Sequence, residues 1–216
     1  MIEKIELKIK VLYNNASHIF QKFVCKNGKY LTLEECAEDI ICGKTPSTKN
    51  NEYWGSDIPF ITIPDMHNSI YTTRYERHLS NGGASTQSNK MLPKNSICVS
   101  CIATPGLVTL TSEESQTNQQ INSIICKDGI SPYYVFLYLK QREIKNTIIQ
   151  LGSGGSTTYN LNKNDFSKIK IKVINDDNMS SFHKSISPLF DLINNLYKEK
   201  NVLNKVKQLY LKKFFG

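Results

Sequence analysis

The last part of the chain carries the longest regular pattern of apolar side chains. They recur in alternating steps of three and four residues, the spacing of a heptad seam along one face of a helix. The members of this seam are Leu189, Leu192, Leu196, Leu203, Val206 and Tyr210. The pattern predicts a helix over 189–215 that begins at Pro188, because the first turn of a helix tolerates proline. So narrow a stripe favours packing on another helix; the alternative is a terminal helix covered by its own domain.

A second amphipathic stripe opens the chain, from Ile2 to Phe23, and its apolar residues again share one helical face. The two stripes end alike, with Ile-Phe-Gln-Lys-Phe over 19–23 and Tyr-Leu-Lys-Lys-Phe over 210–214. This is a weak internal repeat. We expect two similar helices that bracket one globular domain and either pack together or pair with the same helices of a second copy.

Between these stripes, short apolar runs alternate with long polar connections, which predicts an α+β fold. Thr32 and Glu35 form a capping-box pattern for a short helix within 31–41, and an apolar period near 3.6 predicts a helix over 132–150. Strands are expected at 58–63, 96–102, 107–111, 120–126 and 169–174. We divide the chain into an N-terminal helix at 1–24, one globular domain at 25–178, and a long coiled-coil-like helix at 179–216.

The charge of the chain is concentrated on the two helical segments. Of the formal net charge of +8, the helical segments 1–24 and 179–216 hold 11 basic and 4 acidic residues, against 16 and 15 in the globular part. A basic total indicates a polyanionic partner, but the near-neutral globular part does not by itself establish nucleic-acid binding. No signal peptide or membrane span is evident, and six cysteines without framework spacing favour reduced thiols in the cytoplasm.

The sequence gives little support for catalysis, a metal or a cofactor in this chain. Cys98-x-x-Cys101 is half of a zinc pattern, but no second Cys or His pair follows at ligand spacing. The glycine cluster at 152–159 follows a predicted helix, whereas a phosphate-binding loop needs a strand before it and a helix after it. The four histidines are scattered, with no nucleophile in a recognisable turn. We expect no catalytic residue and no metal site.

An ordered set of motifs nevertheless runs through nearly the whole chain. It comprises Gly43-x-Thr45-Pro46-Ser47, Tyr53-Trp54-Gly55-x-x-Ile58-Pro59-Phe60, Leu92-Pro93-x-x-x-Ile97, Thr117-Asn118-Gln119-Gln120, Gly155-Ser156-Thr157 before Leu161, and Ile169-Lys170-Ile171. In this order, followed by a long helix, the set resembles a target recognition domain of a type I restriction-modification specificity subunit. The end of the chain, 209–216, resembles the spacer helix of that family. One departure is the polar segment 175–179, where the family usually has a Pro-rich entry to the spacer.

The resemblance implies a non-catalytic subunit that reads double-stranded DNA. S-adenosylmethionine, Mg²⁺ and ATP would then act only in partner methyltransferase and motor-nuclease subunits. The usual subunit has two recognition domains separated by two spacer helices, whereas this chain resembles one half of it. Two copies paired through 189–215 would restore twofold symmetry and would read an interrupted palindrome. A second half of a split subunit and a truncated relic fit the resemblance as well.

The polar loops supply the expected DNA contacts, because Ser, Thr, Asn, Gln, Lys and Arg side chains bond to base edges and phosphates. Arg74 suits a guanine or a phosphate, Gln87 suits an adenine, and the glycine-rich loop lets the backbone approach a phosphate. Trp54 is expected in the core rather than on a base. The expected contacts are Thr45, Ser47, Thr48, Lys49, Asn50, Asp65, Asn68, Arg74, Ser85, Gln87, Ser88, Lys90, Ser156, Thr157, Thr158 and Tyr159.

Two other functions compete with this interpretation. In the first, the helices bind partner subunits and the globular domain no longer reads DNA, which the near-neutral charge of 25–178 supports. In the second, the chain is a self-contained DNA enzyme that methylates or nicks DNA alone.

Overall fold

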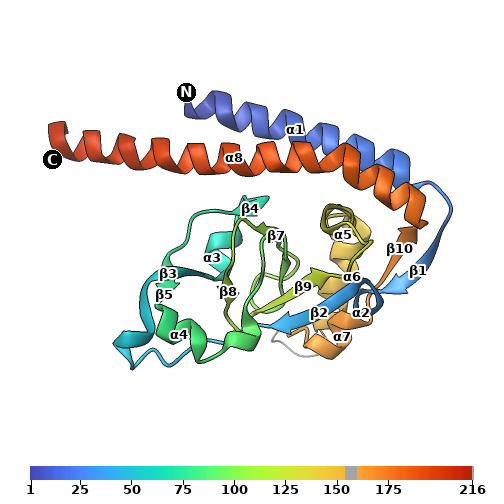
Figure 1. Ribbon diagram of the computed structural model, residues 1–216, viewed down its shortest axis with the longest axis horizontal. Helices are drawn as coiled ribbons and strands as arrows, with labels where there is room; N and C mark the ends of the chain where they lie inside the picture. Colours follow the sequence, from blue (N-terminus) through green and yellow to red (C-terminus); the bar gives the residue numbers. More distant parts are fainter. Residues whose placement is uncertain (154–159, 216) are drawn as a thin grey trace.

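A computed structural model describes residues 1–153 and 160–215. Two antiparallel helices, α1 (Ile2–Val24) and α8 (Asp176–Phe215), lie side by side along one face of a globular domain (Figure 1). One face of α1 packs on α8 and the domain through Ile5, Ile9, Ala16 and Phe20, all buried. The Lys200 ammonium lies 2.7 Å from the Glu6 carboxylate and joins the two helices. The two stripes therefore cover each other over much of their length.

The C-terminal helix begins earlier than expected. It starts at Asp176 rather than at Pro188, and Pro188 lies inside it. An interior proline costs about 3 kcal/mol. Phe182 and Ile186 before it and Phe190 and Ile193 after it are all fully buried, and each such side chain contributes roughly 1.5–3 kcal/mol. Burial on both sides of the proline therefore outweighs its cost, and the helix continues through it.

The described residues of the globular domain form three sheets. The largest has the order β2-β9-β6-β7-β4, the second the order β5-β3-β8, and β1 pairs with β10. The strands of the largest sheet are β2 (Ala37–Cys42), β9 (Ile121–Cys126), β6 (Ile97–Ser100), β7 (Val108–Thr111) and β4 (Tyr71–Thr72). The others are β5 (Arg77–Leu79), β3 (Trp54–Ile61), β8 (Gln116–Thr117), β1 (Gly28–Thr32) and β10 (Lys170–Ile174). The domain is thus the expected mixture of strands and helices.

The largest sheet separates two apolar cores. Ile40, Val99 and Leu110 belong to a core shared with the helix pair, whereas their neighbours Ile41 and Cys98 belong to a second core on the other face. Helix α5 (Pro132–Leu139) lies in the first core, with every residue from Tyr133 to Leu139 buried. Because one continuous core joins sheet, α5, α1 and α8, the domain and the helix pair pack as one body.

Several local predictions need correction. The expected helix over 31–41 is one turn, α2 (Leu33–Cys36), which keeps the Thr32/Glu35 capping box, and the rest is strand β2. The expected helix over 132–150 is two helices, α5 and α6 (Arg142–Ser153). The segments expected to be loops contain α3 (Ile63–Met66), β5, α4 (Asn81–Ser85) and the 3₁₀ turns η1 (Asn51–Tyr53) and η2 (Ser88–Lys90). Helix α7 (Lys163–Ser167) agrees with the expected helical turn.

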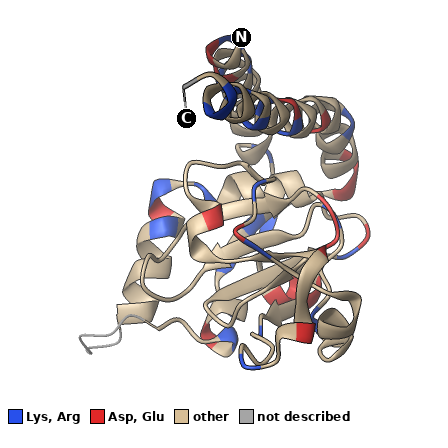
Figure 2. Ribbon diagram, turned by 90° about the vertical axis from the view of Figure 1, so that its left-hand side faces the viewer, with Lys and Arg blue, Asp and Glu red and all other residues tan. Residues whose placement is uncertain are grey.

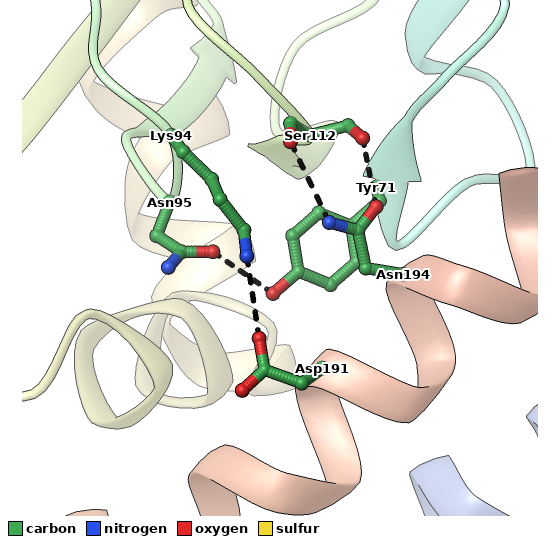
Figure 3. A network of polar contacts seen from close by, with 6 residues as sticks. All are labelled: Tyr71, Lys94, Asn95, Ser112, Asp191 and Asn194. Carbon is green, nitrogen blue, oxygen red and sulfur yellow. Dashed lines mark hydrogen bonds and ion pairs between the residues drawn. The ribbon is translucent and has the colours of Figure 1, made fainter.

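A row of polar contacts also attaches the domain to α8 (Figure 3). The Ser112 hydroxyl donates to Asn194 Oδ1 at 2.8 Å, and both residues are buried. Asn201 Nδ2 donates to the carbonyl and hydroxyl oxygens of Thr73, and Tyr197 accepts from the Ile70 amide. A surface ion pair, Lys94 with Asp191, adds to this row. The row recurs every three or four residues along one side of α8 and fixes how the domain sits on the helix.

Candidate nucleic-acid interface

The first polar loop, 43–50, is clamped against the turn that follows β8. The Lys44 amide donates to the Thr117 carbonyl at 2.9 Å, and the Gly43 amide donates to the Ile121 carbonyl at 3.1 Å. A Cβ at Gly43 would overlap backbone oxygens of Thr117 and Asn118, so only glycine permits this approach. The first and fourth motifs of the ordered set are therefore direct neighbours in space.

The same loop holds a glutamine on the opposing turn. The Thr45 hydroxyl donates to Gln119 Oε1 at 2.6 Å, and Gln119 is exposed. Asn118 and Gln120 bond to each other on either side, through Asn118 Nδ2 to Gln120 Oε1 and the Gln120 amide to Asn118 Oδ1. This turn is therefore held by side chains, and it presents Gln119 to solvent.

The other end of the loop holds an arginine. The Trp54 indole N–H donates to the Ser47 carbonyl at 3.3 Å, and the ring packs edge-on against Phe60. Arg77, from β5, stacks on the outer face of the ring with its guanidinium carbon 3.3 Å from the centroid. Trp54 is half-buried, so it belongs to a small core with Phe60 and also forms the platform for Arg77.

The 3₁₀ turn η1, which directly follows the loop, packs on α4. The Ser80 hydroxyl donates to the Glu52 carbonyl at 2.5 Å, and a Cβ at Gly83 would overlap the Tyr53 carbonyl. These contacts bring together the predicted residues of the first loop and those near α4. Exposed members of this group are Ser47, Thr48, Lys49, Ser85 and Ser88, with Thr45, Asn50 and Lys90 half-buried. The group, which we call the loop edge, lies on the side of the domain away from α1 and α8 (Figure 1).

Other predicted contacts lie elsewhere or are engaged internally. Gln87 is buried, and its Nε2 donates to the Lys44 carbonyl and to Gln116 Oε1, so in this conformation its amide does not face solvent. The Asp65 carboxylate accepts from the Thr62 and Glu76 amides and caps α3. Asn68 has a left-handed backbone, with φ of 56°.

Two predicted residues lie beside parts of the domain that contact α8. Asn68 lines a cavity of about 320 Å³ together with Tyr197 of α8. Arg74 is exposed and directly follows Thr73, which bonds to Asn201 of α8. The predicted contacts Ser156, Thr157, Thr158 and Tyr159 lie outside the described residues. The described members of the predicted set of DNA contacts therefore do not all lie at the loop edge.

Two residues that join the loop edge were missed. Arg77 lies in a polar segment without a core pattern, and nothing in the sequence indicates that it would lie over Trp54. Gln119 stood inside a recognised motif, Thr117-Asn118-Gln119-Gln120, so its place in an ordered polar set was the available signal. Charged side chains of both signs are interspersed over the globular part (Figure 2), in keeping with its near-neutral balance.

The seam on α8 divides into covered and uncovered positions. Leu196 is buried, and Leu189 and Leu203 are partly buried against the shared core. Leu192, Val206 and Tyr210 are 47%, 42% and 62% exposed. Helix α8 extends beyond the start of α1 (Figure 1), and every residue from 205 to 214 is exposed. We call this segment the overhang.

The cysteines behave as core residues where they are buried. Burial raises the pKa of the Cys98 and Cys101 thiols to about 12, so both remain protonated and unreactive near neutral pH. They belong to different cores on opposite faces of the sheet. Within 1–153 and 160–215, no cluster of three or more His, Cys, Asp or Glu side chains could hold a metal ion. In the same ranges, no helix is long and apolar enough to cross a membrane.

Comparison with known proteins gives one family. Residues 26–208 match the model of the type I restriction modification DNA specificity domain. The chain is 46% identical over 172 residues to the type I restriction enzyme HindI specificity subunit of Haemophilus influenzae, covering 80% of this chain and 38% of that subunit. It is 31% identical over 179 residues to the MjaIX specificity subunit of Methanocaldococcus jannaschii, covering 82% and 41%. It thus spans about two fifths of the length of these relatives.

Solved structures agree on the fold. The S subunit of a type I restriction-modification system from M. genitalium superposes with a TM-score of 0.70 at 14% identity, covering 100% of this chain and 57% of that one. The HsdS subunit from Thermoanaerobacter tengcongensis superposes with a TM-score of 0.58 at 12% identity, covering 98% and 52%. The family model covers most of the sequence, and the fold is that of the solved subunits. The chain belongs to the type I restriction modification DNA specificity domain family.

Proposed function

We propose that this chain is a non-catalytic specificity subunit that reads double-stranded DNA through the loop edge. The observation that carries the proposal is the gathering of Thr45, Ser47, Thr48, Lys49, Ser85 and Ser88 on one side of the domain, opposite the helix pair. Their short polar side chains suit base edges and phosphates. Contacts that fix the loop before binding reduce the ordering cost of recognition.

The helix pair would bind partner subunits. Family membership supports a methyltransferase partner and a motor-nuclease partner, and we assign S-adenosylmethionine, ATP and Mg²⁺ to them rather than to this chain. The net positive charge of the two helical segments, 11 basic against 4 acidic residues, would also favour DNA passing near the helices. In this division of labour the chain selects the sequence and its partners carry out the chemistry.

A second copy would complete the assembly. The overhang presents Val206, Leu209, Tyr210 and Phe214, which are 42–68% exposed, beyond the start of α1. An antiparallel partner helix from another copy would cover this apolar line, and each copy would then read one half of an interrupted palindrome. A bound site without twofold symmetry would contradict this homodimer.

The DNA-reading function is tested by selection from a random double-stranded library with the full chain, alone and with its methyltransferase partner. The variant carries alanine at Ser47, Thr48 and Lys49. We expect the wild type to enrich one sequence and the variant to bind it at least about tenfold more weakly, since good base contacts are worth about 1–3 kcal/mol each. A matched control carries alanine at Asn27, Lys29 and Asn164, which are exposed outside the loop edge and the helix pair.

The competing function is assembly without DNA reading, and the near-neutral charge of the globular part favours it. It predicts that the loop variant and the wild type assemble equally and that neither enriches a sequence. Enrichment by the wild type that the loop variant loses, with assembly retained, would exclude this second function.

A further inference from the structure

Two exposed side chains at the loop edge are held in fixed orientations by neighbouring side chains. The first is Gln119. The Thr45 hydroxyl donates to its Oε1 at 2.6 Å, and the turn on either side is closed by Asn118 and Gln120. A free surface glutamine samples several rotamers, and freezing it costs about 1–2 kcal/mol. Here much of that ordering is done before any ligand arrives.

The hydrogen-bonding groups that the Gln119 amide can still offer match those of one base. An amide oxygen has two lone pairs, so Oε1 can accept from Thr45 and still accept a second bond. The Nε2 group retains both of its donors. An acceptor and a donor side by side form the pattern that pairs with N6 and N7 of adenine in the major groove.

The second side chain is Arg77. Its guanidinium carbon lies over the Trp54 ring, 3.3 Å from the ring centroid, and the indole is itself fixed by the Ser47 carbonyl and by Phe60. Stacking holds the plane of the guanidinium and leaves its edge donors free. Within the described ranges no carboxylate forms an ion pair with Arg77. A planar fork of unengaged donors pairs with O6 and N7 of guanine.

Both side chains are anchored to the same short segment, because Thr45 holds Gln119 and Ser47 holds the platform under Arg77. That segment is in turn clamped by the Gly43 and Lys44 amides. Other exposed side chains of the loop edge, such as Thr48 and Lys49, have no comparable contact among the hydrogen bonds and ion pairs of the described residues. Fixed geometry is what base discrimination needs, whereas phosphate contacts tolerate flexible side chains.

We propose that Gln119 and Arg77 are the base-reading side chains of this recognition domain, Gln119 for an adenine and Arg77 for a guanine, with Thr45 and Trp54 as their positioning residues. The inference rests on the proposed DNA-reading function and adds which residues determine specificity. It replaces Gln87, expected at an adenine, and Arg74, expected at a guanine or a phosphate, because Gln87 is buried and Arg74 directly follows Thr73, which bonds to Asn201 of α8.

The test is selection from a randomised double-stranded library with the full chain and each of four variants, Gln119→Ala, Thr45→Val, Arg77→Lys and Arg77→Ala. Gln119→Ala should lose preference at one adenine by about 5- to 150-fold, the worth of one bidentate pair, and leave other positions unchanged. Thr45→Val, which keeps the side-chain volume, should relax the same adenine to a smaller degree. That graded loss at one position is a readout that a purely structural role would not give.

Arg77→Lys separates base reading from phosphate binding, because lysine keeps the charge but loses the planar fork. We expect Arg77→Lys and Arg77→Ala to relax one guanine alike while Arg77→Lys retains the salt dependence of binding. Equal selectivity of Arg77→Lys and wild type, with a shallower salt slope for Arg77→Ala only, would identify a phosphate contact and overturn the assignment. Matched controls are Arg142→Lys and Gln150→Ala, both exposed on α6 and outside the loop edge.

The possible results distinguish a failure of the proposed function from a failure of this inference alone. A wild type that enriches no sequence, alone or with its methyltransferase partner, would overturn the proposed function. A wild type that enriches a sequence, while Gln119→Ala and Arg77→Lys keep its motif unchanged, would overturn only this inference. Melting temperatures equal to the wild type would show that relaxed selectivity does not come from misfolding.

Discussion

At the scale of single residues, Gly43 permits the close backbone contact on which the loop edge depends. Its missing side chain lets the first loop reach the turn at 117–121, where a Cβ would overlap the backbone oxygens of Thr117 and Asn118. Backbone atoms cannot move aside as the end of a flexible side chain can. We expect Gly43→Ala to destabilise the protein by about 1–3 kcal/mol, the usual cost of overpacking. Denaturant unfolding measures this, and DNA binding should weaken with it because Thr45 and Ser47 move.

Gly82 provides the matched control for that substitution. The nearest atom to a Cβ at Gly82 is Ser80 Oγ at 3.7 Å, an ordinary van der Waals contact. Gly82 lies inside α4, where alanine is favoured over glycine by up to about 1 kcal/mol. Gly82→Ala should therefore be neutral or stabilising. Equal losses in the two variants would show that the close approach at Gly43 is not the cause.

The residue scale is also where reasoning from sequence was weakest. Gln87 and Gln119 are both glutamines in polar, loop-like segments, and composition cannot tell them apart. The fold buries Gln87, with its Nε2 donating to the Lys44 carbonyl, and it leaves Gln119 exposed on a held turn. The two glutamines differ because Gln119 is held by Thr45, more than 70 residues away in the sequence. No local sequence pattern encodes such a contact.

At the scale of elements, the polar row on α8 gives the domain one position on the helix. Asn194 is its buried member, and it accepts from the Ser112 hydroxyl at 2.8 Å. Asn194→Ala should cost about 1–3 kcal/mol, because the buried Ser112 hydroxyl loses its partner. A double-mutant cycle with Ser112→Ala should give a coupling energy of roughly 1 kcal/mol. Thermal or denaturant unfolding of the four proteins measures it.

The neighbouring residue supplies the control. Asn195 is exposed, so Asn195→Ala should change the unfolding free energy by less than about 0.5 kcal/mol. A coupling energy near zero in the Asn194 cycle would mean that the apolar contacts around Phe190 hold the domain on α8 without help from the polar row.

Helices and strands could be predicted where apolar residues recur with a single period on one face of the segment. The stripe over Ile2 to Phe23 gave α1 within a residue or two, and the Thr32/Glu35 capping box formed as expected. Prediction was wrong where a segment is buried on both faces. Ile40 and Ile41 enter different cores, so neither a helical nor an alternating pattern was visible and strand β2 was assigned to a helix.

At the scale of the whole molecule, the chain has two unlike surfaces on opposite sides. The loop edge carries pre-positioned polar side chains, and the opposite side carries the helix pair with its uncovered overhang (Figure 1). The ordered motifs made the family identifiable from sequence, and the fold brings the first and the fourth of them together, at 43–47 and 117–120. How far α1 covers the seam was not predictable, since it depends on the lengths and register of two segments about 150 residues apart.

Part of the seam on α8 is buried within the single chain, so the homodimer must be tested at the exposed part. Leu196 is buried against the shared core, so Leu196→Glu would unfold the helix pair whether or not a dimer exists. Val206 and Tyr210 lie on the overhang and are 42% and 62% exposed. Substitution there would change the proposed dimer surface, and we expect it to leave the fold of the single chain intact.

We expect light scattering during size exclusion to give twice the chain mass for the wild type and the single mass for Val206→Glu combined with Tyr210→Glu. Two buried carboxylates in an apolar interface lack partners, and each costs several kcal/mol unless it becomes protonated. Gln208→Glu together with Lys205→Glu adds negative charge to the same overhang off the seam, and this control should remain dimeric. A wild type of single mass would leave the interrupted palindrome without a physical basis. The overhang would then be the surface that a different partner subunit covers.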